Sequence, residues 1–253
     1  MICLRGLLDA AAIDRLREAV ENNLADPGPM ASDYTDAGRG GRYFGDYCNW
    51  ERFDGFRLVA FESELGATAS RLMQSATVRL FHEHVLVKEP GTGEATPWHH
   101  DQPYYCLDGD QSVSFWVPLD PVEQAVCPRF VAGSHHSDDL YTPRLFKTGA
   151  AYDGSESRFR PVPEIDVERE GERIRAWALT PGDAIAFHFR TLHDAPPNLS
   201  AHRRRVVSFR FFGDDMRYGE RPFRPSPPYP DMGLALTQGD RLPEDWFPTV
   251  WPA

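Results

Sequence analysis

The sequence predicts an α+β chain whose core is an antiparallel β-sandwich or jelly roll. Three observations lead to this fold class. Helical periodicity is confined to the first part of the chain, short runs rich in β-branched and aromatic residues follow it, and turn residues separate those runs. Helices that precede a set of short strands typically pack outside an antiparallel sheet.

The composition fits one large domain, or at most two small ones, and argues against several classes of partner. The chain has 253 residues, of which 41% are hydrophobic and 26% charged. Its net charge of -11 argues against nucleic acid or an anionic membrane as the main partner, because both need a basic face. No apolar run approaches the roughly 18 residues of a membrane span, and no signal peptide is expected. The four cysteines, Cys3, Cys48, Cys106 and Cys127, form no C-x-x-C pair, so we expect them to be free thiols. Free thiols are typical of a reducing compartment, so we expect a cytoplasmic protein.

Two helices are predicted before residue 75. The first spans 8–24, with Asp9 as its N-cap, and the Pro- and Gly-rich segment 26–29 ends it. The second spans roughly 56–74, and its buried stripe is predicted to contain Leu58, Phe61, Leu65 and Leu72. Residues 27–53 show no clear period, so a loop is predicted, in which segment 43–47 either folds over a site or is an irregular surface connection.

Strands dominate from Thr77 onward. They are predicted at 78–88, 112–118, 129–131, 174–179, 184–187 and 204–212. Residues 137–170 are polar and contain several Gly and Pro residues, so they are interpreted as a long insertion, with a lid as one role for it. The tail from Asp214 is expected to wrap the surface.

A short motif offers two metal ligands. Residues i and i+2 of a strand point to the same face, so His99 and Asp101 can aim a nitrogen and an anionic oxygen at one point. The best third ligand is His193, in a loop just after a predicted strand. Two histidines and one carboxylate leave three positions open, which suits Fe(II) that must bind a cosubstrate and dioxygen. An H-x-D pattern alone is weak evidence, and a structural zinc site is more often closed by four protein ligands.

Two cations flank this motif in the chain. Lys88 ends one predicted strand and Arg204 begins another, and either can pair with a carboxylate inside the barrel. The alternative for each is a solvated surface cation. Strand alternation directs Arg204 inward and its neighbours Arg203 and Arg205 outward.

Several blocks in this order and spacing resemble the phytanoyl-CoA dioxygenase family of Fe(II)- and 2-oxoglutarate-dependent oxygenases. The matching blocks are 85–90, Trp98-His99-His100-Asp101, 114–119, 132–135, Pro181-Gly182-Asp183, and the run from His193 through Asn198 and Ser200 to Arg204. The resemblance implies a double-stranded β-helix (jelly-roll, cupin-like) core with flanking helices in a single domain over residues 1–253. Its parts are a helical start (about 1–75), the core (about 77–212) and a surface-wrapping tail (about 213–253).

The resemblance also implies roles for individual residues. Iron is expected on His99, Asp101 and His193, and the far carboxylate of 2-oxoglutarate on Arg204. Lys88 matches a position that also contacts this cosubstrate, and Trp116 matches an aromatic residue of the same cavity. The implied activity is a dioxygenase that consumes 2-oxoglutarate and O2, oxidises a small molecule and releases succinate and CO2.

Four positions refine this expectation. Halogenating relatives carry a small residue where this chain has Asp101, so hydroxylation, desaturation or cyclisation is expected instead. His100 stands where many relatives have Gln. Asp194-Ala195 stands where relatives often have Gly-Ser, so a hydroxyl contact near the site is expected to be missing.

The residues that face the substrate are less clearly marked. His84 shares a strand face with Lys88, and Arg210 shares one with Arg204, so both are candidates, with core packing and a structural ion pair as the alternatives. Tyr104 and Tyr105 follow the ligands and either flank the pocket or belong to the core. The alternative function is a metal-binding jelly-roll sensor or binding module without turnover. The substrate itself and the oligomeric state are not readable from the sequence.

Overall fold

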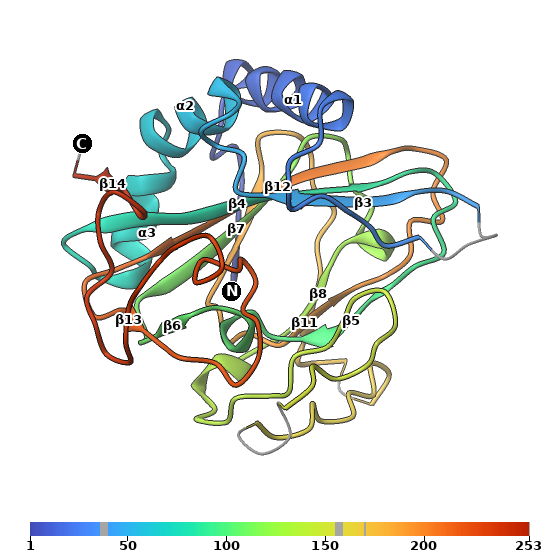
Figure 1. Cartoon of the computed structure of the whole chain (residues 1–253). Coiled ribbons are helices and arrows are strands. Elements are labelled where there is room, and N and C mark those ends of the chain that lie inside the picture. Colours follow the sequence, from blue (N-terminus) through green and yellow to red (C-terminus); the bar gives the residue numbers. More distant parts are fainter. Residues whose placement is uncertain (36–39, 155–158, 170, 253) are drawn as a thin grey trace.

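The computed structural model describes residues 1–35, 40–154, 159–169 and 171–252. Two antiparallel sheets lie one above the other, and the helices cover the outer face of the larger one (Figure 1). The larger sheet has the order β1-β10-β7-β12-β4-β3-β2, and β14 also pairs with β4. Its strands are β1 (Ile2–Leu4), β10 (Ala184–Phe187), β7 (Ser112–Pro118), β12 (Arg204–Phe212), β4 (Val78–Lys88), β3 (Tyr43–Tyr47), β2 (Ser32–Asp33) and β14 (Thr249–Trp251).

The smaller sheet has the order β5-β11-β8-β9, and a separate pair, β6 and β13, lies at one end of the molecule (Figure 1). The bounds are β5 (Thr96–His99), β11 (His193–Ala195), β8 (Arg129–Val131), β9 (Ile174–Arg175), β6 (Leu107–Asp108) and β13 (Arg217–Tyr218). This arrangement confirms the predicted jelly-roll core with flanking helices. The inner faces of the two sheets meet in the interior, and their strands position the site.

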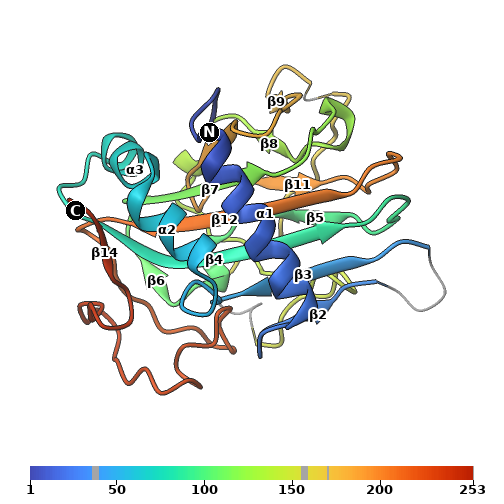
Figure 2. The same ribbon diagram turned by 90° about the horizontal axis from the view of Figure 1, so that it is seen from above.

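Helix α1 (Ala10–Ala25) crosses the larger sheet diagonally, as Figure 2 shows. Asp9 is its N-cap, as predicted, and its carboxylate accepts the N–H of Ala12 at 2.8 Å. The helix buries Ile13, Leu16 and Val20 against the sheet. Burial of this apolar stripe fixes the helices to the outer face and leaves the inner face to the site.

The prediction of one helix over 56–74 was wrong. The segment forms α2 (Asp54–Glu62) and α3 (Leu65–Met73). The break has a local cause, because the Ser63 hydroxyl donates to the Val59 carbonyl at 2.6 Å and the chain is extended at Ser63 (φ -94°, ψ 178°). The change of direction alters the buried face, so Leu72 is 43% exposed and not in the predicted stripe.

The prediction of a loop over 27–53 was wrong for its second half. Residues Tyr43–Tyr47 form β3, which pairs with β4 in continuous antiparallel register from Tyr43↔Lys88 to Tyr47↔His84. Alternation sends Tyr43 and Tyr47 to the same face of the sheet, toward the site. The part of this segment over 36–39 lies outside the described residues.

Two further predictions need correction. The strand predicted at 174–179 is limited to β9, and beyond it only Leu179 forms an isolated bridge, with Val122. The tail does more than wrap the surface: it adds β14 to the larger sheet beside β4 and places Tyr229 and Phe247 in a buried aromatic cluster with Phe81. The other predicted strands are confirmed as β4, β7, β8, β10 and β12.

Among the described residues, no helix combines the length and the apolar character needed to cross a bilayer.

Candidate active site

The two histidines of the predicted metal site are neighbours across a strand pair. His99 ends β5, and His193, which was expected in a loop, begins β11 and is its antiparallel partner. Cross-strand partners project from the same face of a sheet, so the two imidazoles lie with their centroids 4.2 Å apart. Phe130 of β8, the next strand, stacks on the His193 ring at 5.6 Å.

Asp101 does not lie on the same strand as His99, as had been predicted, but in the turn that follows it. Strand β5 ends at His99, and Asp101 has helical dihedrals (φ -72°, ψ -38°) as the N-cap of the 3-10 helix η1 (Gln102–Tyr104). The turn is held by the Asp101 N–H, which donates to the Phe189 carbonyl at 2.8 Å. Oδ1 of Asp101 then lies 3.7 Å from His99 Nε2 and 3.8 Å from His193 Nε2.

The hydrogen bonds around these three residues fit a metal ion. Nδ1 of His99 lies 2.8 Å from the Pro97 carbonyl, and Nδ1 of His193 lies 2.9 Å from the Thr191 carbonyl. Each Nδ1 must donate to its carbonyl, which leaves both Nε2 lone pairs free and directed toward the same carboxylate oxygen. His99, Asp101 and His193 are the one such group of possible metal ligands among the residues that the structure describes.

The protonation states also suit metal binding. Burial lowers the pKa of His99 to about 3, so its imidazole is neutral at physiological pH. Burial raises the pKa of Asp101, but Arg210 and the two imidazoles more than offset this and leave it below its ordinary value. Ser114 supports the anionic form by donating its hydroxyl to Asp101 Oδ2 at 3.2 Å.

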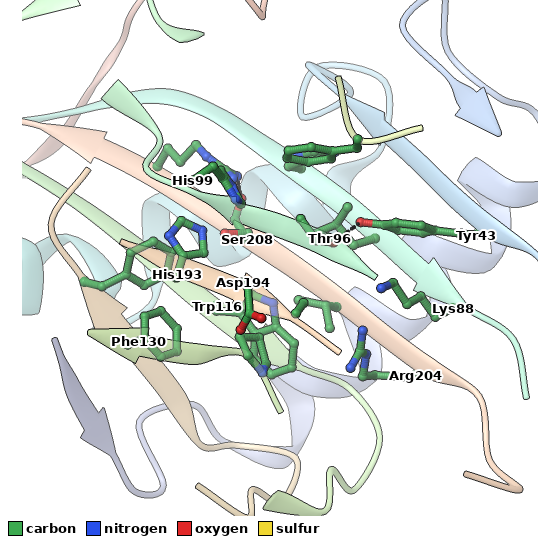
Figure 3. A pocket seen from close by; sticks show the side chains of 18 residues that line it. Tyr43, Lys88, Thr96, His99, Trp116, Phe130, His193, Asp194, Arg204 and Ser208 are labelled. Carbon is green, nitrogen blue, oxygen red and sulfur yellow. Dashed lines mark hydrogen bonds between the residues drawn. The ribbon is translucent and has the colours of Figure 1, made fainter. Parts of the chain in front are cut away.

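A cavity extends from the histidines to two buried cations. Figure 3 shows His99 and His193 at one end and Lys88 and Arg204 at the other, with Trp116 on the wall between them. Lys88 of β4 and Arg204 of β12 are antiparallel partners, so alternation brings both onto the inner face. Arg203 and Arg205 point outward as predicted, where Glu21, Glu89 and Asp120 pair with them.

The described contacts of the two basic side chains are mainly with carbonyl groups and an aromatic ring, although Glu94 and Asp194 act on Lys88 electrostatically and raise its pKa. Lys88 Nζ donates to the Glu94 carbonyl at 2.7 Å and lies 4.4 Å from the Tyr43 ring centroid, while Arg204 donates to the Val126 carbonyl. Among the described residues, neither forms an ion pair with a carboxylate. Burial and the charge of Arg204 lower the pKa of Lys88 to about 6, and burial lowers the pKa of Arg204. Two buried cations on one wall favour an anionic ligand.

Both departures from the family pattern have a structural role. Asp194 lies at the cavity but forms an ion pair with Arg129, whose Nε donates to it at 2.9 Å. His100 is buried and points away from the ligands, and its Nε2 accepts the N–H of Tyr141 at 2.8 Å. His100 therefore ties the insertion at 137–170 to the turn that carries Asp101.

This tie gives a stability prediction. The variant His100→Ala should lower the free energy of unfolding by about 1–3 kcal/mol, because it leaves the Tyr141 N–H without an acceptor. The variant His100→Gln keeps an acceptor for the Tyr141 N–H, so its free energy of unfolding should fall clearly less. Urea unfolding of the three proteins measures both values, and equal losses in the two variants would contradict this role for His100.

The predicted substrate-facing residues lie around a second cavity. His84 and Arg210 line both cavities, whereas Tyr104 and Tyr105 line only the second. Tyr104 also tethers the insertion, because its hydroxyl bonds both the carbonyl (2.8 Å) and the N–H (2.7 Å) of Arg144. Arg210 Nε donates to the Tyr105 hydroxyl and lies 3.6 Å from Asp101 Oδ2.

Two residues of the site were not singled out in the sequence analysis, although Tyr43 lies in segment 43–47, for which a fold over a site was one interpretation. Phe146, from the insertion, packs against His99 with ring centroids 4.9 Å apart and lines both cavities, so this part of the insertion covers the histidines. Tyr43 covers Lys88 and hydrogen-bonds Thr96 at 3.1 Å. The signal for Tyr43 was its spacing of four from Tyr47 in a short aromatic run; no pattern in the sequence marks Phe146.

A family model described as phytanoyl-CoA dioxygenase (PhyH) matches residues 1–206. The chain belongs to the phytanoyl-CoA dioxygenase family. This membership, the His-Asp-His group and the cavity with its two cations make it an Fe(II)- and 2-oxoglutarate-dependent enzyme of the dioxygenase class.

Several solved structures share this fold. SnoN, a non-haem α-ketoglutarate-dependent epimerase from nogalamycin biosynthesis, is 23% identical with a TM-score of 0.74, and the match covers 98% of this chain and 92% of that one. The carbocyclase SnoK of the same biosynthesis is 21% identical with a TM-score of 0.73, covering 98% and 90%. EvdO2 from Micromonospora carbonacea var. aurantiaca, complexed with 2-oxoglutarate, is 18% identical with a TM-score of 0.61, covering 87% and 88%.

Proposed function

We propose that the chain is a single oxygenase domain that oxidises a small organic molecule by hydroxylation or a related hydrogen abstraction. His99, Asp101 and His193 would hold the iron, and Lys88 and Arg204 would bind the far carboxylate of 2-oxoglutarate. The observation that carries this proposal is one cavity lined by His99 and His193 at one end and by Lys88 and Arg204 at the other, with Asp101 within ligand distance of both histidines. The presence of a carboxylate at Asp101 supports oxygenation over halogenation.

Each residue has a defined task in this proposal. Bound iron, with 2-oxoglutarate and dioxygen, supplies the oxidation, which releases succinate and CO2. The carbonyls of Pro97 and Thr191 fix the tautomers of the two histidines, and Ser114 orients Asp101. Lys88 and Arg204 bind and orient the far carboxylate, and Trp116 lines the wall between the two ends of the cavity. Phe146 covers His99 and limits the access of water.

Anaerobic spectroscopy and a product assay test this function together. Fe(II) and 2-oxoglutarate added without oxygen should give a weak visible charge-transfer band, and a metabolite panel screened aerobically should contain a compound that stimulates succinate release. If neither the band nor any succinate is observed, the proposed function is wrong. A band without succinate for any compound would favour the binding module without turnover.

The pKa of Lys88 gives a prediction for pH dependence. Its free-state value of about 6 means that the amine is mostly neutral above that pH, whereas a bound carboxylate favours the ammonium form. Binding of 2-oxoglutarate should therefore take up a proton, and its affinity should fall as pH rises from 6, by at most about tenfold per pH unit. Calorimetry on the Ni(II)-loaded protein in buffers of different ionisation enthalpy measures this uptake.

The matched variant is Lys88→Met, which cannot take up this proton. Its affinity for 2-oxoglutarate should depend less on pH than that of the wild-type protein. An identical pH slope in the two proteins would show that another group binds the proton.

A small-molecule substrate and a cytoplasmic location complete the proposal. The first is supported by SnoN, which was crystallised with Fe3+, α-ketoglutarate and nogalamycin RO. The second is supported by four free thiols, Cys3, Cys48, Cys106 and Cys127, of the kind that a reducing compartment maintains.

A further inference from the structure

A second cavity of about 400 Å³ adjoins the proposed iron site at Asp101. It shares His84, Phe146 and Arg210 with the cosubstrate cavity, and its size is within the range of sites for drug-sized ligands, roughly 300–1,000 Å³. A molecule bound there lies beside the iron ligands without occupying the space between them and the two cations Lys88 and Arg204.

The charges around this second cavity favour an anion. Its lining contains three cations, Arg144, Lys147 and Arg210, and Asp101 is the one carboxylate among the described lining residues. Arg210 is buried, and Asp101, at 3.6 Å, is the one carboxylate with which it forms an ion pair in the described part of the chain. Iron bound to Asp101 would share that negative charge, which favours a further anion near the buried guanidinium. Arg210 lines the cavity, and its described hydrogen bonds go to uncharged oxygen atoms, the Tyr105 hydroxyl and the Ser208 carbonyl.

Two imidazoles beside Arg210 have nitrogen atoms without a partner. Nδ1 of His82 and Nε2 of His84 are both buried and have no hydrogen-bond partner within the described structure. Both side chains line the second cavity, because His82 and His84 lie on the inner face of β4. Buried polar atoms of this kind are costly unless a ligand or water satisfies them. Arg210 and the two imidazoles together form a polar pocket for oxygen atoms.

Two groups of aromatic rings contribute to the lining of the second cavity. Tyr47 forms one wall with the imidazoles, 5.9 Å from His82 and 5.4 Å from His84. Tyr104 forms the other with two rings of the insertion, Phe146 at 6.1 Å and Tyr152 at 5.6 Å. The two groups of rings favour a flat, unsaturated ligand that can stack on them or contact their edges.

We propose that the substrate is a flat aromatic anion whose oxyanion pairs with Arg210, with its ring system between Tyr47 and the Tyr104–Tyr152 wall. This substrate class rests on the proposed function, since only then does the cavity face the reacting iron. Arg210 acts as the anchor of the substrate, and His82 and His84 bond the remaining oxygen atoms at the same end. The cations Arg144 and Lys147 at the insertion attract the same anion.

Binding of three matched probes tests the charge and the shape separately. Calorimetry is performed with protein loaded with Ni(II) and saturating 2-oxoglutarate, using 2-naphthoate, the neutral 2-naphthamide and the saturated decahydro-2-naphthoate. We expect 2-naphthoate to bind at least tenfold more tightly than either of the other two. If the amide binds as tightly as 2-naphthoate, the substrate need not be an anion. If the saturated acid binds as tightly, the substrate need not be flat. If 2-naphthoate does not bind at saturating 2-oxoglutarate, the probe enters the cosubstrate cavity instead, and the proposal is overturned.

Variants then assign the anion preference to Arg210. Arg210→Gln should remove the preference for 2-naphthoate over the amide, whereas Arg210→Lys should keep part of it. The control Arg241→Gln, at an exposed position outside this cavity, should leave it unchanged. A preference that persists in Arg210→Gln overturns the proposal. Tyr152→Leu, at a less buried position, tests the aromatic wall even if Arg210→Gln does not fold, and unchanged 2-naphthoate affinity there counts against the stacking.

Failure of this inference is distinguishable from failure of the proposed function. Ni(II) and 2-oxoglutarate binding is measured in the same titrations before any probe is added. Loss of both would contradict the proposed function, and the probes can still be compared on the metal-free protein. Normal binding of metal and cosubstrate together with no discrimination among the probes would overturn the substrate class alone.

Discussion

Replacing His193 with alanine should abolish the charge-transfer band of the Fe(II) and 2-oxoglutarate complex and reduce succinate release by more than about 100-fold. Substitution of a residue that only hydrogen-bonds a metal ligand already lowers metal affinity or activity by about 10–100-fold. Loss of a ligand itself should therefore lower both further. The structural reason is the short distance of both Nε2 atoms from Asp101 Oδ1, 3.7 Å from His99 and 3.8 Å from His193. Without His193, the two remaining ligands do not enclose the ion.

The control for this variant is His202→Ala, since His202 is exposed and outside the group of possible metal ligands. It should keep the band and the rate of the wild-type protein. Calorimetry with Ni(II) adds a readout that does not depend on turnover. Wild-type metal affinity in His193→Ala would show that the ion binds elsewhere, and the proposed iron site would be wrong.

Strand alternation made part of this site predictable. A long strand such as β4 or β12 fixes the direction of its side chains locally, so His84 and Lys88 could be assigned to one face, and Arg204 and Arg210 to another, without knowing the fold. The pairing of β4 with β12 then joins the two faces into one wall. All four residues line the cavities, and their roles there stay predictions.

Other parts depend on contacts between distant segments. His99 and Asp101 were expected together because of i, i+2 alternation, but the strand ends between them and a turn held by Phe189 brings the carboxylate back. The strand β3 contains no β-branched residue and is stabilised by its pairing with β4, which no local pattern reports. Phe146 reaches His99 because His100 and Tyr104 tether the insertion, and neither tether has a signature in the sequence.

Replacing Arg204 with glutamine should weaken 2-oxoglutarate binding by about 10- to 150-fold, which corresponds to the roughly 1.5–3 kcal/mol of hydrogen bonds to a charged group. Arg204 is buried and is held by the Val126 carbonyl, so its guanidinium is already directed into the cavity. Its partner Lys88 can supply part of the lost charge, because removal of Arg204 takes away one cause of the low Lys88 pKa, but an ammonium group cannot replace the bidentate fork of the guanidinium. Calorimetry with the Ni(II)-loaded protein measures the dissociation constant.

Two matched variants separate the geometry of this contact from its charge. Arg204→Lys keeps the positive charge but not the planar fork, so its affinity should lie between those of the wild-type protein and Arg204→Gln. Arg203→Gln removes a guanidinium one residue away that faces outward and pairs with Glu21 and Glu89, so it should leave the affinity unchanged. If all three variants bind 2-oxoglutarate like the wild-type protein, its far carboxylate does not lie at Arg204, and the cavity between the histidines and the two cations has another occupant.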